Sequence, residues 1–185
     1  MVILIFNVMK QLLLIFMVML GSCAKKHDES KDDKLLFFKT NLIGNELRID
    51  GYYYVINKFG DYGGAQFFYE DGISHNIGGS FNSLTLLEEY INDVSNNNGA
   101  KYKSGWGLFK IKGNSLYFEQ WDSKPFGGIY KVFSQECEIL NSTAFIVKKK
   151  YRLVNGQQTE VTFPNHTYHF VQFQNKPSSD NNFIP

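Results

Sequence analysis

The stretch WGLFKIKGNSLYFEQW, residues 106–121, decides how the rest of the chain is expected to fold. Two alternating runs flank Gly113-Asn114, a residue pair that suits the positive-φ positions of a two-residue hairpin turn. This pattern predicts a β-hairpin. The predicted register pairs Lys112 with Ser115, Ile111 with Leu116, Phe109 with Phe118, Leu108 with Glu119, and Trp106 with Trp121.

Side chains alternate across a strand, so this hairpin has two distinct faces. One face is apolar and is predicted to be core; it carries Phe109, Ile111, Leu116 and Phe118. The other face carries Trp106, Leu108, Lys110, Tyr117, Glu119 and Trp121. Both tryptophans of the chain lie on this second face as a cross-strand pair. They are either a stabilising clamp, worth ~0.2–1 kcal/mol, or the wall of a ligand site.

Composition favours a single β-rich domain. The chain has 185 residues, of which 16% are aromatic, with 17 Phe, 11 Tyr and only 4 Pro. Such a length supports one hydrophobic core, and a Phe- and Tyr-rich composition favours strands. Lys10 is the one charged residue before Cys23, so the remainder carries 18 basic and 18 acidic residues. No basic patch with interleaved aromatics is visible, which argues against a nucleic-acid partner.

Other segments of the chain also read as short strands separated by turns. The predicted strands are 46–57, 65–70, 73–79, 127–134, 137–140, 144–153, 159–163 and 167–173. Residues 34–42 fit either a first strand or a short helix. Residues 83–96 change to helical spacing, with Leu84, Leu87, Ile91 and Val94 on one stripe. Either Thr85, in a Thr85-x-x-Glu88 capping box, or Ser83 is the candidate N-cap. We therefore expect a mainly β fold, a single antiparallel barrel or sandwich of about eight to ten strands with one helix.

The amino-terminal segment, residues 1–22, is nearly all apolar, and it reads as either a membrane anchor or an export signal. From Met9 onward it has the parts of a short signal peptide, so we expect translation to start at Met9. It ends in Leu20-Gly21-Ser22-Cys23, which resembles the lipobox of bacterial lipoproteins. That resemblance implies cleavage before Cys23 and attachment of acyl chains such as palmitate to its thiol and its new amine. Several acyl chains anchor a protein to a membrane more firmly than one chain can.

The resemblance also implies a Gram-negative envelope protein held in the outer membrane, because Ala24 follows the lipidated cysteine; whether it faces the periplasm or the cell surface stays open. Residues 23–34 are short and highly charged and are expected to form a flexible lipidated tether. The β domain is then expected over 35–175, followed by a coil tail over 176–185. The last residues of that tail, Phe183-Ile184, are expected to tuck into an edge of the sheet.

Repeated hairpins after a Gly51-Tyr52-Tyr53 start resemble the lipocalin and calycin barrels. This resemblance implies an interior cavity for a small apolar or amphipathic ligand. The aromatic residues that would line it are Tyr52, Tyr54, Phe68, Trp106, Trp121 and Tyr130. The alternative is a non-catalytic envelope module with an exposed aromatic face around Trp106 and Trp121, which would bind a protein or a polysaccharide.

Residues suited to catalysis or metal binding are few. His166 and His169 would point to opposite faces of a regular strand, so they cannot hold one metal ion together. Glu119 and Asp122 are the carboxylates that a glycan hydrolase would need, but carboxylates at strand ends are usually solvated. The sequence thus predicts no catalytic residue, no metal site and no cofactor.

Overall fold

The structure is a computed structural model that describes residues 31–96, 102–123, 128–154, 157–161 and 165–185. The predicted signal peptide and Cys23 lie outside the described residues. A compact unit covers Asp32–Pro185. Its elements are β1 (Gly51–Ile56), β2 (Tyr62–Phe68), β3 (Ile73–Ile77), α2 (Leu84–Asn96), β4 (Trp106–Lys112), β5 (Ser115–Trp121), β6 (Val132–Asn141), β7 (Ala144–Val154), β8 (Gln157–Val161) and β9 (Thr167–Gln172).

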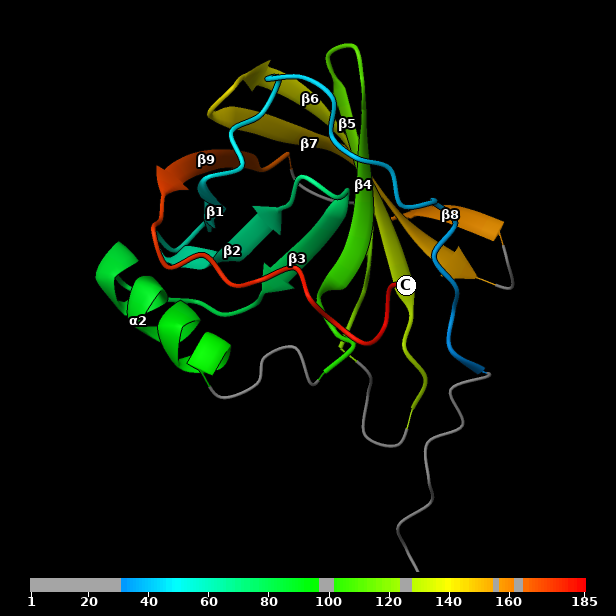
Figure 1. Ribbon diagram of the computed structural model, residues 1–185, viewed down its shortest axis with the longest axis horizontal. Helices are drawn as coiled ribbons and strands as arrows, with labels where there is room; N and C mark the ends of the chain where they lie inside the picture. Colours follow the sequence, from blue (N-terminus) through cyan, green and yellow to red (C-terminus); the bar gives the residue numbers. More distant parts are fainter. Residues whose placement is uncertain (1–30, 97–101, 124–127, 155–156, 162–164) are drawn as a thin grey trace, which may run out of the picture. The chain divides into compact units, whose positions relative to one another are not determined.

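Eight of these strands close into an antiparallel barrel (Figure 1). The sheet order is β6-β5-β4-β3-β2-β1-β9-β7, and β6 pairs with β7 to complete the circle. The edge of β7 that faces away from β6 pairs with two different strands. Ala144–Ile146 pair with β9, whereas Lys150–Val154 pair with β8. Strand β8 therefore extends the sheet beyond the barrel. The predicted mainly β barrel is confirmed, and the β6–β7 pairing closes what would otherwise be two open sheet edges.

The central hairpin has the predicted register from the Gly107–Gln120 pair to the turn. Lys112 pairs with Ser115, and Phe109 pairs with Phe118. Gly113 has φ +58°, as a turn of this kind requires. The strands on either side of the hairpin are β3 and β6, so its two strands lie in the middle of the barrel wall.

The inward face of the hairpin belongs to an aromatic cluster that fills part of the barrel. The ring of Phe68 on β2 lies 5.7 Å from that of Phe118 on β5 and 5.9 Å from that of Phe145 on β7. These strands are not neighbours in the sheet, so the contacts cross the interior. We call this set the inner cluster; its buried members are Leu47, Tyr53, Phe68, Phe109, Leu116, Phe118, Cys137, Ile139, Phe145 and Val147.

The outward face of the same hairpin is buried too. It joins a second set, the outer cluster, whose buried members are Tyr52, Ala65, Phe67, Tyr69, Ile73, Ile77, Leu87, Ile91, Trp106, Leu108, Trp121, Tyr130, Val132, Leu153, Phe173 and Ile184. Three segments outside the barrel wall cover this set: α2, an N-terminal strap of residues 32–42, and a C-terminal tail of residues 173–185. Phe183-Ile184 pack against the domain, but Ile184 is buried in this cluster on the outside of the barrel wall and not at a strand edge.

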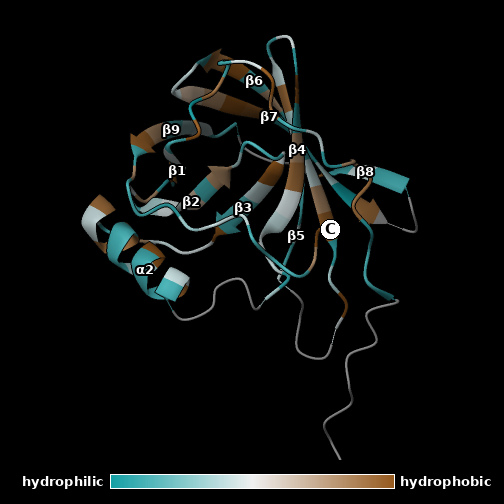
Figure 2. Ribbon diagram, in the orientation of Figure 1, coloured by the Kyte–Doolittle hydropathy of each residue, from teal (hydrophilic) through white to brown (hydrophobic). Residues whose placement is uncertain are grey.

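Helix α2 forms where the sequence predicted it. Ser83 caps it, accepting a hydrogen bond from Leu86 N at 3.2 Å. Leu87 and Ile91 are buried, and hydrophobic and hydrophilic positions alternate along the helix (Figure 2). Its apolar stripe packs against the outside of the barrel at β2. Within the described residues, no helix has the length and apolar character needed to cross a membrane.

The strap is neither the strand nor the helix that the sequence allowed for residues 34–42. It runs as an extended coil across the outside of the barrel, where Leu35 and Phe37 pack against the outer cluster. Asp32 fixes its start: one carboxylate oxygen accepts from Tyr130 N at 2.9 Å, and the other meets Lys103 Nζ at 3.0 Å. Packing therefore begins at Asp32, inside the segment that was expected to be a flexible tether.

Candidate functional site

The six aromatic residues predicted to line a ligand cavity are divided between the two clusters. Phe68 belongs to the inner cluster, whereas Tyr52, Trp106, Trp121 and Tyr130 belong to the outer cluster. Tyr54 is half-buried beside the rings of Tyr62 and His169. The residues separate because neighbours along a strand point to opposite sides of the barrel wall.

The alternative of an exposed aromatic face at the tryptophans is wrong. Trp106 is 1% exposed and Trp121 is 5% exposed. Trp121 lies beneath the strap and donates from Nε1 to Asp33 O at 2.8 Å. The strap and the tail cover the face that an isolated hairpin would expose. The local pattern of residues 106–121 does not predict that these segments lie there.

Glu119 is also placed differently from the expectation of a solvated carboxylate. It is fully buried under the strap, and burial raises the pKa of its carboxyl group. Its Oε1 accepts a hydrogen bond of 2.5 Å from Phe37 N. Asp122 is exposed, as expected. The two carboxylates thus lie in opposite environments, and Glu119 serves to hold the strap.

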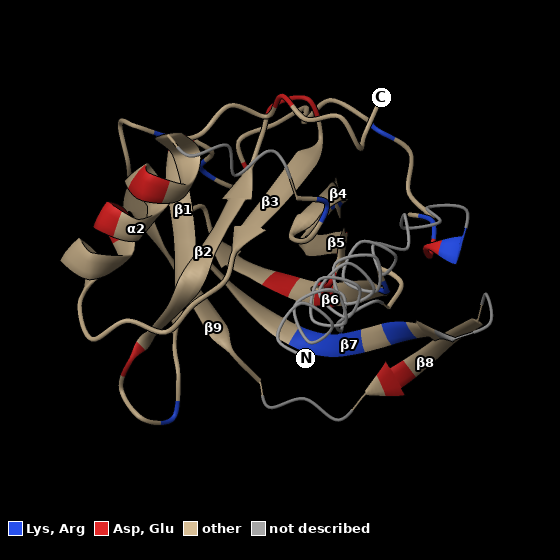
Figure 3. Cartoon of the chain, turned by 90° about the horizontal axis from the view of Figure 1, so that it is seen from below, with Lys and Arg blue, Asp and Glu red and all other residues tan. Residues whose placement is uncertain are grey.

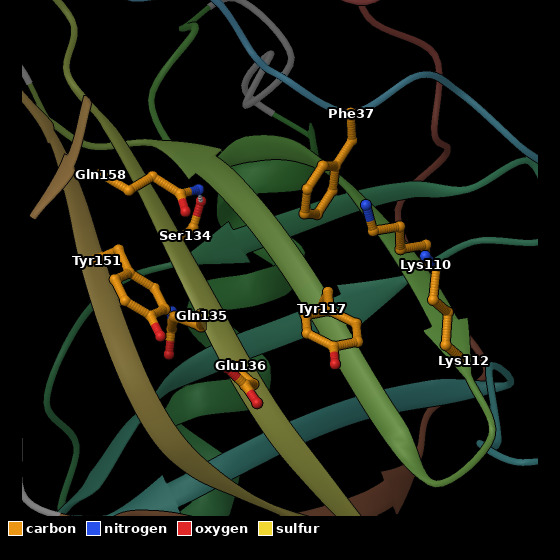
Figure 4. Close-up of a pocket in the computed structure, with 9 residues that line it drawn as sticks. All are labelled: Phe37, Lys110, Lys112, Tyr117, Ser134, Gln135, Glu136, Tyr151 and Gln158. Carbon is orange, nitrogen blue, oxygen red and sulfur yellow. Dashed lines mark hydrogen bonds between the residues drawn. The ribbon is translucent and has the colours of Figure 1, made fainter. Parts of the chain in front are cut away.

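An open groove of about 340 Å³ lies on the outer surface beside Phe37 of the strap (Figure 4). Strands β4 to β8 and the strap all contribute to it. The lining residues are Phe37, Lys110, Lys112, Tyr117, Ser134, Gln135, Glu136, Tyr151 and Gln158.

The floor of the groove is a cross-strand pair. Tyr117 on β5 pairs with Glu136 on β6, and both are half-buried. Figure 4 shows Glu136 on the strand between Tyr117 and Tyr151. A carboxylate between two phenol groups gives this floor hydrogen-bond acceptors and donors beside aromatic carbon.

One wall comes from the strap and β4. The amine of Lys110 lies 3.7 Å from the centre of the Phe37 ring, a cation–π contact that holds the ring in place. Glu119 fixes the backbone of Phe37, and Lys110 fixes the ring of Phe37. Two separate contacts therefore hold this wall in place.

The opposite wall comes from β7 and β8. Gln158 donates from Nε2 to Ser134 Oγ at 3.2 Å, and Tyr151 pairs with Glu160 across the β7–β8 ribbon. Basic β7 lies between acidic positions on β6 and β8 (Figure 3). The wall exists because β7 continues past the barrel and carries β8 with it.

The groove therefore combines three aromatic rings with amide, hydroxyl, amine and carboxylate groups. The sequence did not point to Phe37, Tyr151 or Gln158. The alternation of the hairpin predicted that Tyr117 lies on its second, outward face, and this was the one sign in the sequence that it could line a surface site. In the part of the chain that the structure describes, no cluster of three or more His, Cys, Asp or Glu is arranged to hold a metal ion.

Comparisons of the chain with protein families, with curated proteins and with solved structures found no match.

Proposed function

We propose that this chain is a lipid-anchored, non-catalytic protein of the Gram-negative cell envelope that binds a short saccharide in the outer groove. The observation that carries the proposal is the arrangement of Phe37, Tyr117 and Tyr151 around polar groups on five strands and the strap. A sugar ring has apolar C–H faces and a rim of hydroxyl groups, so it is an amphipathic ligand that needs both kinds of contact.

The barrel interior supports ligand binding less well than the groove. Phe68 touches the rings of Phe109, Phe118 and Phe145, with centroids 4.9–5.9 Å apart. Barrels of about eight strands are often filled by their own side chains. A ligand placed there would have to displace aromatic pairs that are worth ~0.5–1.5 kcal/mol each beyond their burial.

The polar groups of the groove suit hydroxyl recognition. Glu136 accepts hydrogen bonds, Lys110 and Lys112 donate them, and Gln158 can do both. The groove carries both signs of charge, so it has no strong preference for an anion or a cation. Its open shape admits a chain end or an internal unit of a glycan.

The anchoring part of the proposal rests on the lipobox at Leu20–Cys23 and the short charged segment that follows it. A mass spectrum of the membrane-extracted protein tests it. Cleavage before Cys23 with added acyl chains is expected. An uncleaved and unacylated mass would show that residues 1–20 anchor the protein instead.

Calorimetric titration with oligosaccharides released from lipopolysaccharide and from peptidoglycan tests the binding part. We expect Tyr117→Ala to weaken saccharide binding about tenfold, equivalent to ~1.4 kcal/mol, through loss of the ring from the floor. Tyr102→Ala is the matched control, because Tyr102 is exposed and does not line the groove. Equal binding by Tyr117→Ala and the unchanged protein would refute the groove as the site.

A further inference from the structure

Exposed apolar side chains are concentrated along the strap and directly after it. Among the large hydrophobic residues of the described part of the chain, Ile43 and Phe38 have the highest exposed fractions, 90% and 88%, and Leu36 is 48% exposed. Single exposed apolar residues are normal on a folded protein. Three of them within residues 36–43 are a local concentration of the kind that marks an interaction surface.

The strap has two sides with different surroundings. Leu35 and Phe37 pack against the outer cluster, whereas Leu36 and Phe38 are exposed. In Figure 1 the strap is the blue-to-cyan segment that crosses the barrel. The barrel therefore uses one side of the strap for its own packing, and the other side presents apolar groups to the surroundings.

The backbone of the strap is fixed at several points. Asp32 holds its start through Tyr130 N. Phe37 N donates to Glu119 Oε1 in its middle, and Leu42 N at its end donates to the backbone oxygen of residue 70 at 2.8 Å. A strap held in this way cannot turn over to bury its exposed side chains, so the apolar surface is a permanent feature of the fold.

The charged residues of this segment are all basic. Residues 34–43 include Lys34 and Lys39 and no acidic residue. Lys34 is exposed, and Lys39 Nζ lies 3.3 Å from Asp71 Oδ2 at the surface. Apolar side chains flanked by lysines are typical of segments that lie in the interface of a bilayer, because the lysines there meet anionic head groups.

The tether limits how far the strap can lie from a membrane. This step rests on the proposed function, in which Cys23 carries acyl chains that are inserted in a bilayer. Nine residues lead from Cys23 to Asp32, and a chain of that length spans roughly 30 Å when fully extended. A short flexible link also gives an effective concentration on the order of millimolar, so even a weak contact with the bilayer is populated. Leu36 and Phe38 follow the end of this link within a few residues.

We propose that residues 34–43 dock on the bilayer that holds the lipid anchor. Leu36, Phe38 and Ile43 enter the interfacial region, and Lys34 lies at the anionic head groups. This contact orients the domain relative to the membrane. Because Phe37 lines the outer groove, the docking places one wall of the groove beside the membrane surface.

Fluorescent labels at two matched positions test the docking. The acylated full-length chain is placed in vesicles of phosphatidylethanolamine and phosphatidylglycerol, with a thiol-reactive bimane label on either Phe38→Cys or Phe59→Cys. Phe59 is the control, because it is 78% exposed and lies outside the strap. The label reacts with the introduced cysteine, since Cys137 is buried and an acylated Cys23 has no free thiol.

We expect the label at position 38 to be quenched by lipids with brominated acyl chains and to be shielded from iodide in the water. The label at position 59 should show the opposite pattern.

A second comparison uses two leucines of similar exposure, 48% for Leu36 and 45% for Leu86 on α2. Leu36→Asp should reduce the quenching by lipid at position 38, because a carboxylate is repelled by anionic head groups and is costly to desolvate. Leu86→Asp should leave that quenching unchanged.

Equal quenching of the two labels, or equal effects of the two leucine substitutions, would overturn the proposal. If mass spectrometry shows acyl chains on Cys23 and the label at position 38 still escapes the lipid quencher, the anchor stands and the docking is wrong. Shielding from iodide without quenching by lipid would indicate a second copy of the chain on the strap, which also overturns the docking. A chain without acyl groups overturns the anchor and the docking together.

Discussion

The two faces of the β4–β5 hairpin are both buried, but they are buried by different means. The inward face, with Phe109 and Phe118, is covered by other strands of the barrel. The outward face, with Trp106, Glu119 and Trp121, is covered by the strap, the tail and α2. Barrel closure alone buries the first face, whereas the second depends on segments that are not part of the barrel wall.

This difference has a chemical consequence. The inward face is packed mainly through aromatic and aliphatic side chains such as Phe109 and Phe118, where shape and volume dominate. The outward face includes polar atoms that need particular partners, such as Asp33 O for Trp121 and Phe37 N for Glu119. The candidate groove lies on the outward side, where the strap crosses the surface of the barrel.

The largest effect is expected on the inward face. Phe118→Ala removes a ring that contacts Phe68 and Phe145, so it should lower the free energy of unfolding by about 3–5 kcal/mol. Urea unfolding, monitored by circular dichroism, measures this free energy. Phe59→Ala, at an exposed position, should change the value by less than about 0.5 kcal/mol. A loss below ~1 kcal/mol at Phe118 would mean that the interior is not packed as described.

The next effect concerns the start of the strap. Asp32→Asn keeps the side-chain shape but removes the charge that faces Lys103 in a largely buried pair. We expect the unfolding free energy to fall by about 2–3 kcal/mol, since the lysine loses its counter-charge. Faster proteolysis within residues 32–42 should accompany the loss. Unchanged stability would show that the strap is not held by this carboxylate.

Glu119 should make stability depend on pH in an unusual direction. Its pKa is raised by burial, so between its unfolded and folded pKa values the folded state binds more protons than the unfolded state. Its contribution to stability is therefore greatest at acid pH and falls as pH rises through that window. Glu119→Gln should remove this fall, which unfolding curves from pH 4 to pH 8 measure. An identical pH profile for the variant would contradict the assignment.

The smallest effect is expected at an exposed ion pair. Lys148 Nζ lies 3.0 Å from Glu138 Oε2, the same distance as in the Lys103–Asp32 pair, but both side chains are nearly half exposed. Glu138→Gln should change the unfolding free energy by less than about 0.5 kcal/mol. The contrast with Asp32→Asn isolates burial as the variable. If Glu138→Gln lowered the unfolding free energy as much as Asp32→Asn, burial would not explain the difference between the two ion pairs.

The sequence alone predicted the elements whose causes are local. Gly113-Asn114 predicted the hairpin turn, alternation predicted the register of its strands, and Ser83 with the Leu87 and Ile91 spacing predicted α2. A lipidated amino terminus at Cys23 is likewise a sequence-based prediction. Each of these depends on neighbours a few residues apart, which is the range over which dihedral preferences and side-chain periodicity act.

Tertiary structure alone decided which buried face would carry the candidate groove. Phe37 contacts Glu119 across 82 residues of sequence, and the outer groove forms only when the strap, β5 and the β7–β8 ribbon come together. Likewise, Trp106 and Trp121 look equivalent in the sequence, yet the strap gives one a hydrogen-bond partner and the tail leaves the other unpaired. Such contacts arise from chain closure over long distances, which no local pattern specifies.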